Sequence, residues 1–235
     1  MRRNEFRNMV WFFILFGCLI LVGIREKNQP EMQIFSRNTV WKYAASQDMQ
    51  TAPRVALTFD DGPHPVYTKL LLEGLKKRGV KATFFVVGEN IPGKEELILE
   101  MEKQGHLICN HTYDHCNLKS VSLEAAWEEL EKTSRLIQDI TGHATAYVRP
   151  PYGNWKEELD DKTSMIAVKW TLDTLDWNTH NTSDIVNKVV TNVKENDIIL
   201  LHDYYQTSVE AALQIVDCLV EKGYQFVTVD ELILA

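Results

Sequence analysis

Short apolar runs recur along most of the chain, and each is bounded by polar or turn-forming residues. The runs short enough to be buried β-strands are 54–59, 82–88, 106–110, 146–150, 165–170, 197–202 and 225–229. Apolar residues recur at helical spacing between several of them, which predicts amphipathic helices over 122–140, 183–194 and 207–222. Strands that alternate with helices are typical of a parallel sheet. The pattern predicts an α/β fold in which about seven parallel strands form a (β/α) barrel.

The first 24 residues differ in character from the rest of the chain. A basic start is followed by an uncharged, mostly apolar run over 8–24. As a helix this run would cover roughly 25 Å, against about 30 Å for the core of a bilayer. No small-residue cleavage site follows closely, so we expect residues 1–24 to be an uncleaved signal anchor, a single membrane-spanning helix, with cleavage and secretion as the alternative. The basic start should stay in the cytoplasm, which places the remainder outside the cell membrane.

Residues 25–53 are polar and show no sustained period, so we interpret them as a linker to one folded domain over 54–235. The formal net charge of the chain is −8. Residues 1–24 contribute +2, from three arginines and one glutamate, which leaves −10 for the remainder. An acidic body lacks the clustered lysines and arginines that bind a phosphate backbone. No nucleic-acid partner is therefore expected.

Polar clusters follow five of the predicted strands, at the point where each strand ends. They lie at 60–61, 110–115, 149–153, 173–177 and 201–203. The carboxyl ends of parallel strands meet at one rim of a barrel, and catalytic residues of such folds lie there. Loops that were merely solvated would not follow this rule, so the five clusters indicate a single site.

His111 and His115 are four residues apart and can converge on one metal ion. Two histidines alone are weak evidence, because solvated loop histidines are common. A carboxylate from Asp60 or Asp61 would complete a three-ligand site with open positions, as in catalytic zinc sites. Successive side chains of a strand point to opposite faces, so we expect one aspartate to bind the metal and the other to accept a proton.

Three further segments carry polar groups suited to the same site. Arg149 precedes two prolines, and a guanidinium beside the free aspartate would keep that carboxylate ionised and oriented. The backbone amide of Tyr152 is a candidate oxyanion donor. His202 ends an apolar strand, and a carboxylate from 173–177 would raise its pKa and make it a general acid. Trp177 and Tyr152 offer flat faces that suit sugar rings, or equally a core.

Together these groups indicate metal-assisted hydrolysis of an amide or ester by an activated water. No serine or cysteine nucleophile stands in a recognisable setting. Two alternatives stay open. A non-haem iron oxygenase also uses two histidines and a carboxylate, although the alternation of strands and helices disagrees with its usual antiparallel double-sheet barrel. A catalytically inactive glycan-binding module is the other.

In their order along the chain, these motifs resemble those of the polysaccharide deacetylases, carbohydrate esterase family 4, which share the NodB homology domain. The resemblance covers about 54–230, and its motifs are TFDDGP (58–63), HTYDH (111–115), RPPYG (149–153), DTLDW (173–177) and LLHD (200–203). It implies a distorted (β/α) barrel that hydrolyses N-acetyl groups on a glycan. The implied cofactor is a divalent metal, usually Zn²⁺ and sometimes Co²⁺ or another divalent ion.

The resemblance also implies a role for each matching residue. Asp60 would be the base, and Arg149 would orient it. His202 would be the acid that protonates the leaving amine, and Asp173 would be its partner. The residues that would bind the metal are Asp61, His111 and His115. The residues that would hold the oxyanion and shape the acetyl pocket are Tyr152, Pro151, Trp177 and Leu200.

The motifs say less about which polymer is the substrate. TFDDGP and RPPYG are both kept, which by the resemblance favours N-acetylglucosamine units over lactam-forming muramic units. With an anchor that faces the wall, the expected polymer is peptidoglycan. A chitooligosaccharide, an exopolysaccharide such as poly-N-acetylglucosamine, and acetylated xylan stay open, because polymer choice lies in the variable loops.

Overall fold

The computed structural model describes residues 52–234. The predicted anchor over 1–24 and most of the predicted linker over 25–53 lie outside the described residues. Among residues 52–234, no helix combines the length and the apolar character that crossing a membrane requires.

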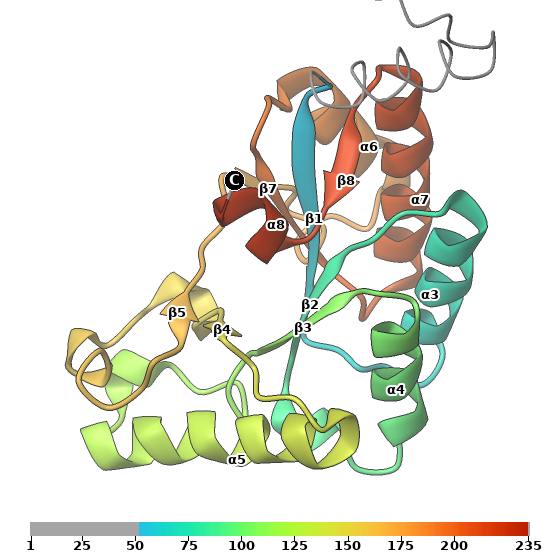
Figure 1. Cartoon of the computed structure of the whole chain (residues 1–235). Helices are drawn as coiled ribbons and strands as arrows, with labels where there is room; N and C mark the ends of the chain where they lie inside the picture. The colour runs from blue at the N-terminus through green and yellow to red at the C-terminus, as the bar shows by residue number, and fades with distance from the viewer. Residues whose placement is uncertain (1–51, 235) are drawn as a thin grey trace, which may run out of the picture. The chain divides into compact units, whose positions relative to one another are not determined.

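Eight strands of the described part form one sheet, and all of their pairings are parallel (Figure 1). The strands are β1 (Arg54–Asp60), β2 (Thr83–Val86), β3 (Leu107–Asn110), β4 (Tyr147–Val148), β5 (Ile166–Ala167), β6 (Leu172–Asp173), β7 (Ile198–His202) and β8 (Gln225–Val227). All seven predicted strands are present, most of them shorter than predicted. β6 was not predicted, because a strand of two residues leaves no apolar run of its own.

The strand order is β5-β4-β3-β2-β1-β7-β6, with β8 paired to β1. Ala56 pairs with Ile198 of β7 and with Val227 of β8, so these two strands lie on opposite edges of β1. β8 and β2 therefore share one edge of β1. β8 pairs with its first part, Arg54–Ala56, and β2 pairs with its last part, from Thr58 onward. Within residues 52–234 no pairing joins β5 to β6. The sheet is thus a half-barrel, and the prediction of a barrel is corrected: β4, β5 and β6 are too short to complete the wall.

α-Helices connect most of the consecutive strands, and α8 follows the last one. They are α3 (Tyr67–Arg78), α4 (Glu95–Lys103), α5 (Leu123–Thr141), α6 (Thr182–Asn192), α7 (Gln206–Glu221) and the short α8 (Val229–Ile233). The three predicted helices correspond to α5, α6 and α7 within two residues at each end. Ser122 caps α5, since its hydroxyl accepts a hydrogen bond from the backbone N–H of Ala125 at 3.2 Å. α3 packs against α4 and α7 (Figure 1).

The alternation of side chains along β1 separates the core from the site. The side chains that pack with the helices in the main hydrophobic core are Val55, Leu57 and Phe59. Thr58 and Asp60 alternate with them and are also buried, and both contact the guanidinium of Arg149 on the opposite face of the sheet. β1 thus supplies the centre of the core with one face and places a carboxylate at the carboxyl rim with the other.

Candidate active site

The polar clusters predicted to share a rim do line one pocket, with a volume of ≈ 330 Å³. They come from the segments that end or follow β1, β3, β4, β6 and β7. The lining residues are Asp60, Asp61, His111, His115, Pro150, Tyr152, Trp170, Asp173, Trp177, Leu200 and His202. The rule that parallel strands present their carboxyl ends together is therefore confirmed for this chain.

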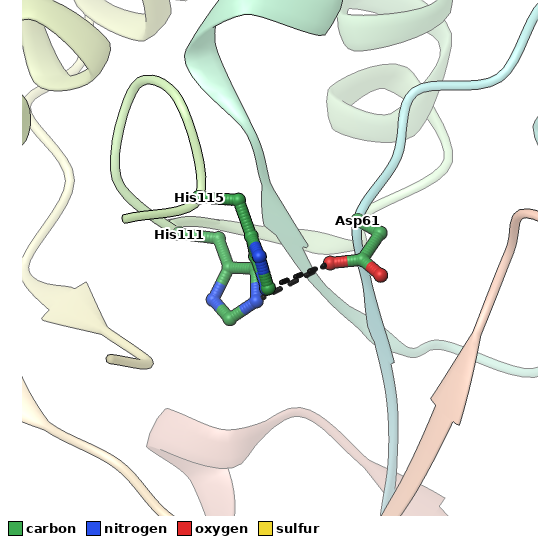
Figure 2. Close-up of side chains that lie close together, drawn as sticks. All are labelled: Asp61, His111 and His115. Atoms are coloured by element: carbon green, nitrogen blue, oxygen red, sulfur yellow. Dashed lines mark ion pairs between the residues drawn. The ribbon is translucent and has the colours of Figure 1, made fainter. Parts of the chain in front are cut away.

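Asp61, His111 and His115 point toward one another (Figure 2). Oδ1 of Asp61 lies 3.5 Å from Nε2 of His111 and 3.4 Å from Nε2 of His115. The three donor atoms all lie within 4.8 Å of one another. These three residues were predicted to converge, and the structure brings them together.

The surrounding contacts leave these donor atoms ready for a metal. Nδ1 of His111 lies 2.6 Å from the carbonyl oxygen of Arg149, and a carbonyl only accepts, so Nδ1 donates, and Nε2 is the nitrogen that faces Asp60 and Asp61. Burial lowers the pKa of His115, which favours the neutral imidazole. The buried Oδ1 of Asp61 has no hydrogen-bond partner among the described residues. Two imidazoles and a carboxylate are a donor set that suits Zn²⁺ or a similar divalent ion.

The charge of Asp61 also fits a ligand. Burial raises the pKa of this carboxyl, but His111, His202 and His115 together lower it to about 2. The carboxylate is therefore ionised at neutral pH, as a metal ligand must be.

α5 holds the turn that carries the two histidines. Oε2 of Glu129 accepts hydrogen bonds from the backbone N–H groups of Tyr113 and Asp114, each at 2.9 Å. Thr112 and His115 have left-handed backbone conformations, with φ of 64° and 60°. Such conformations are unfavourable for residues other than glycine and persist only where neighbouring contacts impose them. No role was predicted for Glu129, because it lies 14 residues beyond His115, on a different element.

Replacing Glu129 by alanine should therefore weaken metal binding roughly 10–100-fold, the usual range for an outer-shell contact. The reason is that two N–H groups of the histidine turn lose their charged acceptor. A competition titration against a zinc-binding dye measures the affinity. Glu128→Ala, at an exposed position of the same helix, is the matched control and should bind metal like the parent chain. Equal affinities for the two variants would contradict the assigned role.

Arg149 fixes Asp60 beside the metal ligands. Its Nη1 donates to Oδ1 of Asp60 at 2.7 Å and to the hydroxyl of Thr58 at 2.8 Å. The guanidinium is fully buried and lies over the ring of Phe85, 4.1 Å from its centroid. Oδ2 of Asp60 lies 3.7 Å from Nε2 of His111. The expected pair of a guanidinium and a free aspartate is present.

The partner of His202 is Asp176, and the expectation of Asp173 is corrected. Nδ1 of His202 lies 2.8 Å from Oδ1 of Asp176, and the backbone N–H of His202 donates to Oδ2 of Asp176 at 2.8 Å. Asp173 instead accepts a hydrogen bond from the backbone N–H of Leu175 and lines the pocket. Burial lowers the pKa of His202, but the hydrogen bond and charge of Asp176 outweigh it and raise this pKa to about 9. His202 is thus protonated at neutral pH.

Asp203 supports the turn that carries Asp61, a role that the sequence analysis did not assign. The hydroxyl of Thr68 donates to Oδ2 of this buried carboxyl and accepts from the backbone N–H of His64 at 2.7 Å. A Cβ at Gly62 would lie 2.4 Å and 2.5 Å from the two oxygens of Asp203, so only glycine fits there. Burial raises the pKa of Asp203 to about 7. The signal in the sequence was an acidic residue directly after an apolar strand.

Three of the four predicted substrate residues line the pocket, and the fourth, Pro151, is replaced there by its neighbour Pro150. Tyr152, Trp177 and Leu200 line it. Pro151 is buried, and its neighbour Pro150 lines the pocket instead. Trp170 also lines it, and the sequence analysis read this tryptophan only as part of a strand. The role of the Tyr152 amide as an oxyanion donor stays a prediction.

Comparisons with known proteins agree with this geometry. Residues 47–170 match the family model described as polysaccharide deacetylase. The chain is 39% identical over 178 residues to the peptidoglycan-N-acetylmuramic acid deacetylase PdaC of Bacillus subtilis, across 76% of this chain and 38% of PdaC. It is 36% identical over 214 residues to a peptidoglycan-N-acetylglucosamine deacetylase of Bacillus cereus, across 88% of this chain and 78% of that relative.

A solved structure leads to the same family. The structure of PdaC from Bacillus subtilis aligns with a TM-score of 0.76 at 38% identity, across 78% of this chain and 91% of that chain. A half-barrel with two histidines and a carboxylate at its carboxyl rim is the architecture of carbohydrate esterase family 4, whose deacetylases are metalloenzymes. The chain belongs to the polysaccharide deacetylase family. It spans about two fifths of the length of PdaC.

Proposed function

We propose that this protein removes N-acetyl groups from N-acetylglucosamine units of peptidoglycan and releases acetate. The observation that carries the proposal is a base and an acid, each with its own partner, beside one group of metal ligands. Asp60 and His202 are paired in register across β1 and β7, and both line the pocket. Arg149 holds the first and Asp176 holds the second.

Asp61, His111 and His115 would hold the divalent ion, which supplies a Lewis acid that polarises the acetyl carbonyl and acidifies water. Asp60 accepts a proton from the attacking water, and Arg149 holds its carboxylate in position. The water oxygen adds to the acetyl carbon, and the bond between this carbon and the sugar nitrogen then breaks. Protonated His202 gives a proton to the leaving amine, while Asp176 stabilises its charge. The products are acetate and a free amino sugar.

The choice of polymer rests on the relatives and on the motifs. The relatives in Bacillus subtilis and Bacillus cereus both carry names that specify peptidoglycan. The intact TFDDGP and RPPYG motifs favour N-acetylglucosamine as the unit that is deacetylated. N-acetylmuramic acid is the second candidate, because PdaC is named for that unit.

Two further parts of the proposal concern the metal and the location. The ligand set favours Zn²⁺, with Co²⁺ or another divalent ion as the alternative. We place the catalytic domain outside the cell membrane, held by residues 8–24 as a single membrane-spanning segment. Secretion after signal cleavage is the alternative.

The test is an assay of the purified chain on peptidoglycan and on N-acetylchitooligosaccharides with added Zn²⁺. We expect acetate from both, and mass analysis of muramidase fragments should place the free amine on glucosamine. A free amine on muramic acid would favour the second candidate. No acetate in the presence of metal would contradict the proposal and favour a glycan-binding module. Acetate release without oxygen would exclude an oxygenase.

Removal of the metal should abolish acetate release without unfolding the domain. The ligands lie on turns at the rim, while the core is built from other residues, so the fold does not depend on the ion. Dialysis against a chelator, followed by circular dichroism and an acetate assay, tests this. Added Zn²⁺ or Co²⁺ should restore turnover, and Mg²⁺, which prefers oxygen ligands, should not.

A further inference from the structure

Exposed aromatic rings gather at one end of the molecule. Within residues 52–234, four tyrosine and tryptophan side chains are exposed: Tyr152 (66%), Trp177 (51%), Tyr204 (43%) and Tyr205 (36%). All four lie in segments that follow the carboxyl ends of β4, β6 or β7. No other phenylalanine, tyrosine or tryptophan within residues 52–234 is as exposed as these. Such a concentration marks a binding surface, because large apolar faces are seldom left in water without a function.

Two of the four rings are already explained, since Tyr152 and Trp177 line the catalytic pocket. Tyr204 and Tyr205 do not line it and have no part in the chemistry. They follow His202 by two and three residues, so they lie next to a residue that lines the pocket. Their position points to a ligand that continues beyond the pocket.

Ring contacts join these two tyrosines to neighbouring segments of the rim. The ring of Tyr204 meets that of His64 edge-on, with centroids 5.1 Å apart, and the ring of Tyr205 meets that of His180 at 5.4 Å. Tyr204 and Tyr205 contact each other at 5.9 Å. We call these four residues the aromatic strip. His64 lies three residues after Asp61, and His180 lies three residues after Trp177. The strip therefore joins three segments that each also line the pocket, through Asp61, Trp177 and His202.

The chemistry of the strip suits a sugar. Tyrosine combines a rigid apolar ring with a hydroxyl, and it fits ligands that have both an apolar face and polar edges. A pocket of ≈ 330 Å³ is at the small end of ligand sites and has room for about one sugar unit with its acetyl group. A polysaccharide must continue past such a pocket, and the strip is the continuous exposed aromatic surface beside it.

We propose that Tyr204 and Tyr205 form a subsite for a sugar unit next to the one in the pocket, and that this subsite makes the enzyme prefer long glycan chains. The inference rests on the proposed function, since the occupant is a second unit of the same N-acetylglucosamine polymer. The subsite adds binding contacts and no chemical step.

The test compares a disaccharide and a hexasaccharide of N-acetylglucosamine with the full-length protein loaded with zinc. For the variant Tyr204→Ala/Tyr205→Ala, we expect the ratio of kcat/KM between hexasaccharide and disaccharide to fall roughly tenfold, mainly through KM. Tyr204→Phe/Tyr205→Phe keeps both ring faces and should restore most of the ratio. Leu99→Ala removes an apolar side chain of similar exposure (45%) from α4, away from the strip, and should leave the ratio unchanged.

An unchanged ratio in the double alanine variant would overturn the proposal. An equal loss on both substrates would do the same, since it would mean that the rings only hold the loops in place. Isothermal titration calorimetry measures the affinity of the parent chain and of the double alanine variant for the hexasaccharide. This measurement does not depend on turnover, so it separates the subsite proposal from the proposed function. If no acetate appears from any substrate, the proposed function fails, and the weaker hexasaccharide binding expected of the alanine variant still tests the subsite.

Discussion

Replacing Asp60 by asparagine should abolish acetate release and leave the metal content unchanged. Asparagine keeps the size of the side chain and an oxygen that can accept from Arg149, but it cannot take a proton from water. Loss of a general base lowers turnover by about 10²–10⁴-fold. The three donor atoms that face one another belong to Asp61, His111 and His115, so the ion should remain. An acetate assay and elemental analysis of the same preparation measure both quantities.

His111→Ala provides the contrast, since it removes a donor atom and should lose both metal and turnover. Nε2 of His111 lies 3.7 Å from Oδ2 of Asp60 and 3.5 Å from Oδ1 of Asp61. These distances are too similar to decide by themselves which aspartate binds the metal and which is the base. The contact of Arg149 with Asp60 decides the assignment, because a carboxylate that already pairs with a cation is a weaker metal ligand. If Asp60→Asn also emptied the metal site, the roles of the two aspartates would be exchanged.

The sequence predicted those residues of the site that lie at the carboxyl ends of strands. Asp60, His111, Arg149 and His202 stand at or directly after β1, β3, β4 and β7, and one rule of parallel sheets brings them together. The same rule says nothing about groups that reach the site from helices or from beneath the turns. Glu129 acts in this way, from α5, through contacts with the backbone N–H groups of Tyr113 and Asp114. No local pattern marks such a residue, whereas Asp203 directly follows the end of β7 and its position could have been read as a signal.

The fold was predicted where the elements are long. α5 and α7, of 19 and 16 residues, each carry enough apolar periods to fix their ends closely. β4, β5 and β6 have two residues each, so whether they close a barrel depends on tertiary pairing and not on any apolar run. The sequence therefore predicted a parallel sheet with helices correctly and predicted its closure wrongly.

The choice between Asp173 and Asp176 shows the same limit within one motif. The two aspartates are three residues apart, and either could reach His202 from the end of a strand. The backbone between them turns at Leu175, which has a left-handed φ of 58°, and this turn buries Asp176 completely while Asp173 faces the pocket. A positive φ at a leucine is imposed by the tertiary structure, so the identity of the partner was not readable from the residue types.

Replacing Asp176 by asparagine should therefore move the alkaline limit of activity to lower pH. In the parent chain the pKa of His202 is raised to about 9, so the acid form is present at neutral pH and is lost as the pH rises through that value. Without the charge of Asp176, only Asp60 and Asp61 are left to offset burial, so the pKa of His202 should fall from about 9 and turnover should be lost at a lower pH than in the parent chain. Profiles of kcat against pH, measured on zinc-loaded protein, test this.

Asp173→Asn is the matched control, because its carboxylate lines the same pocket without contacting the ring of His202. It should keep the alkaline limit near that of the parent chain. The same pairing also contributes to stability: the raised pKa favours the folded state fully below about 6.5, and this contribution fades as the pH rises through about 9. Asp176→Asn should therefore lose more thermal stability at pH 6 than at pH 10. If the alkaline limit moved in Asp173→Asn and not in Asp176→Asn, the acid would depend on Asp173, and the hydrogen bond at 2.8 Å would have no catalytic role.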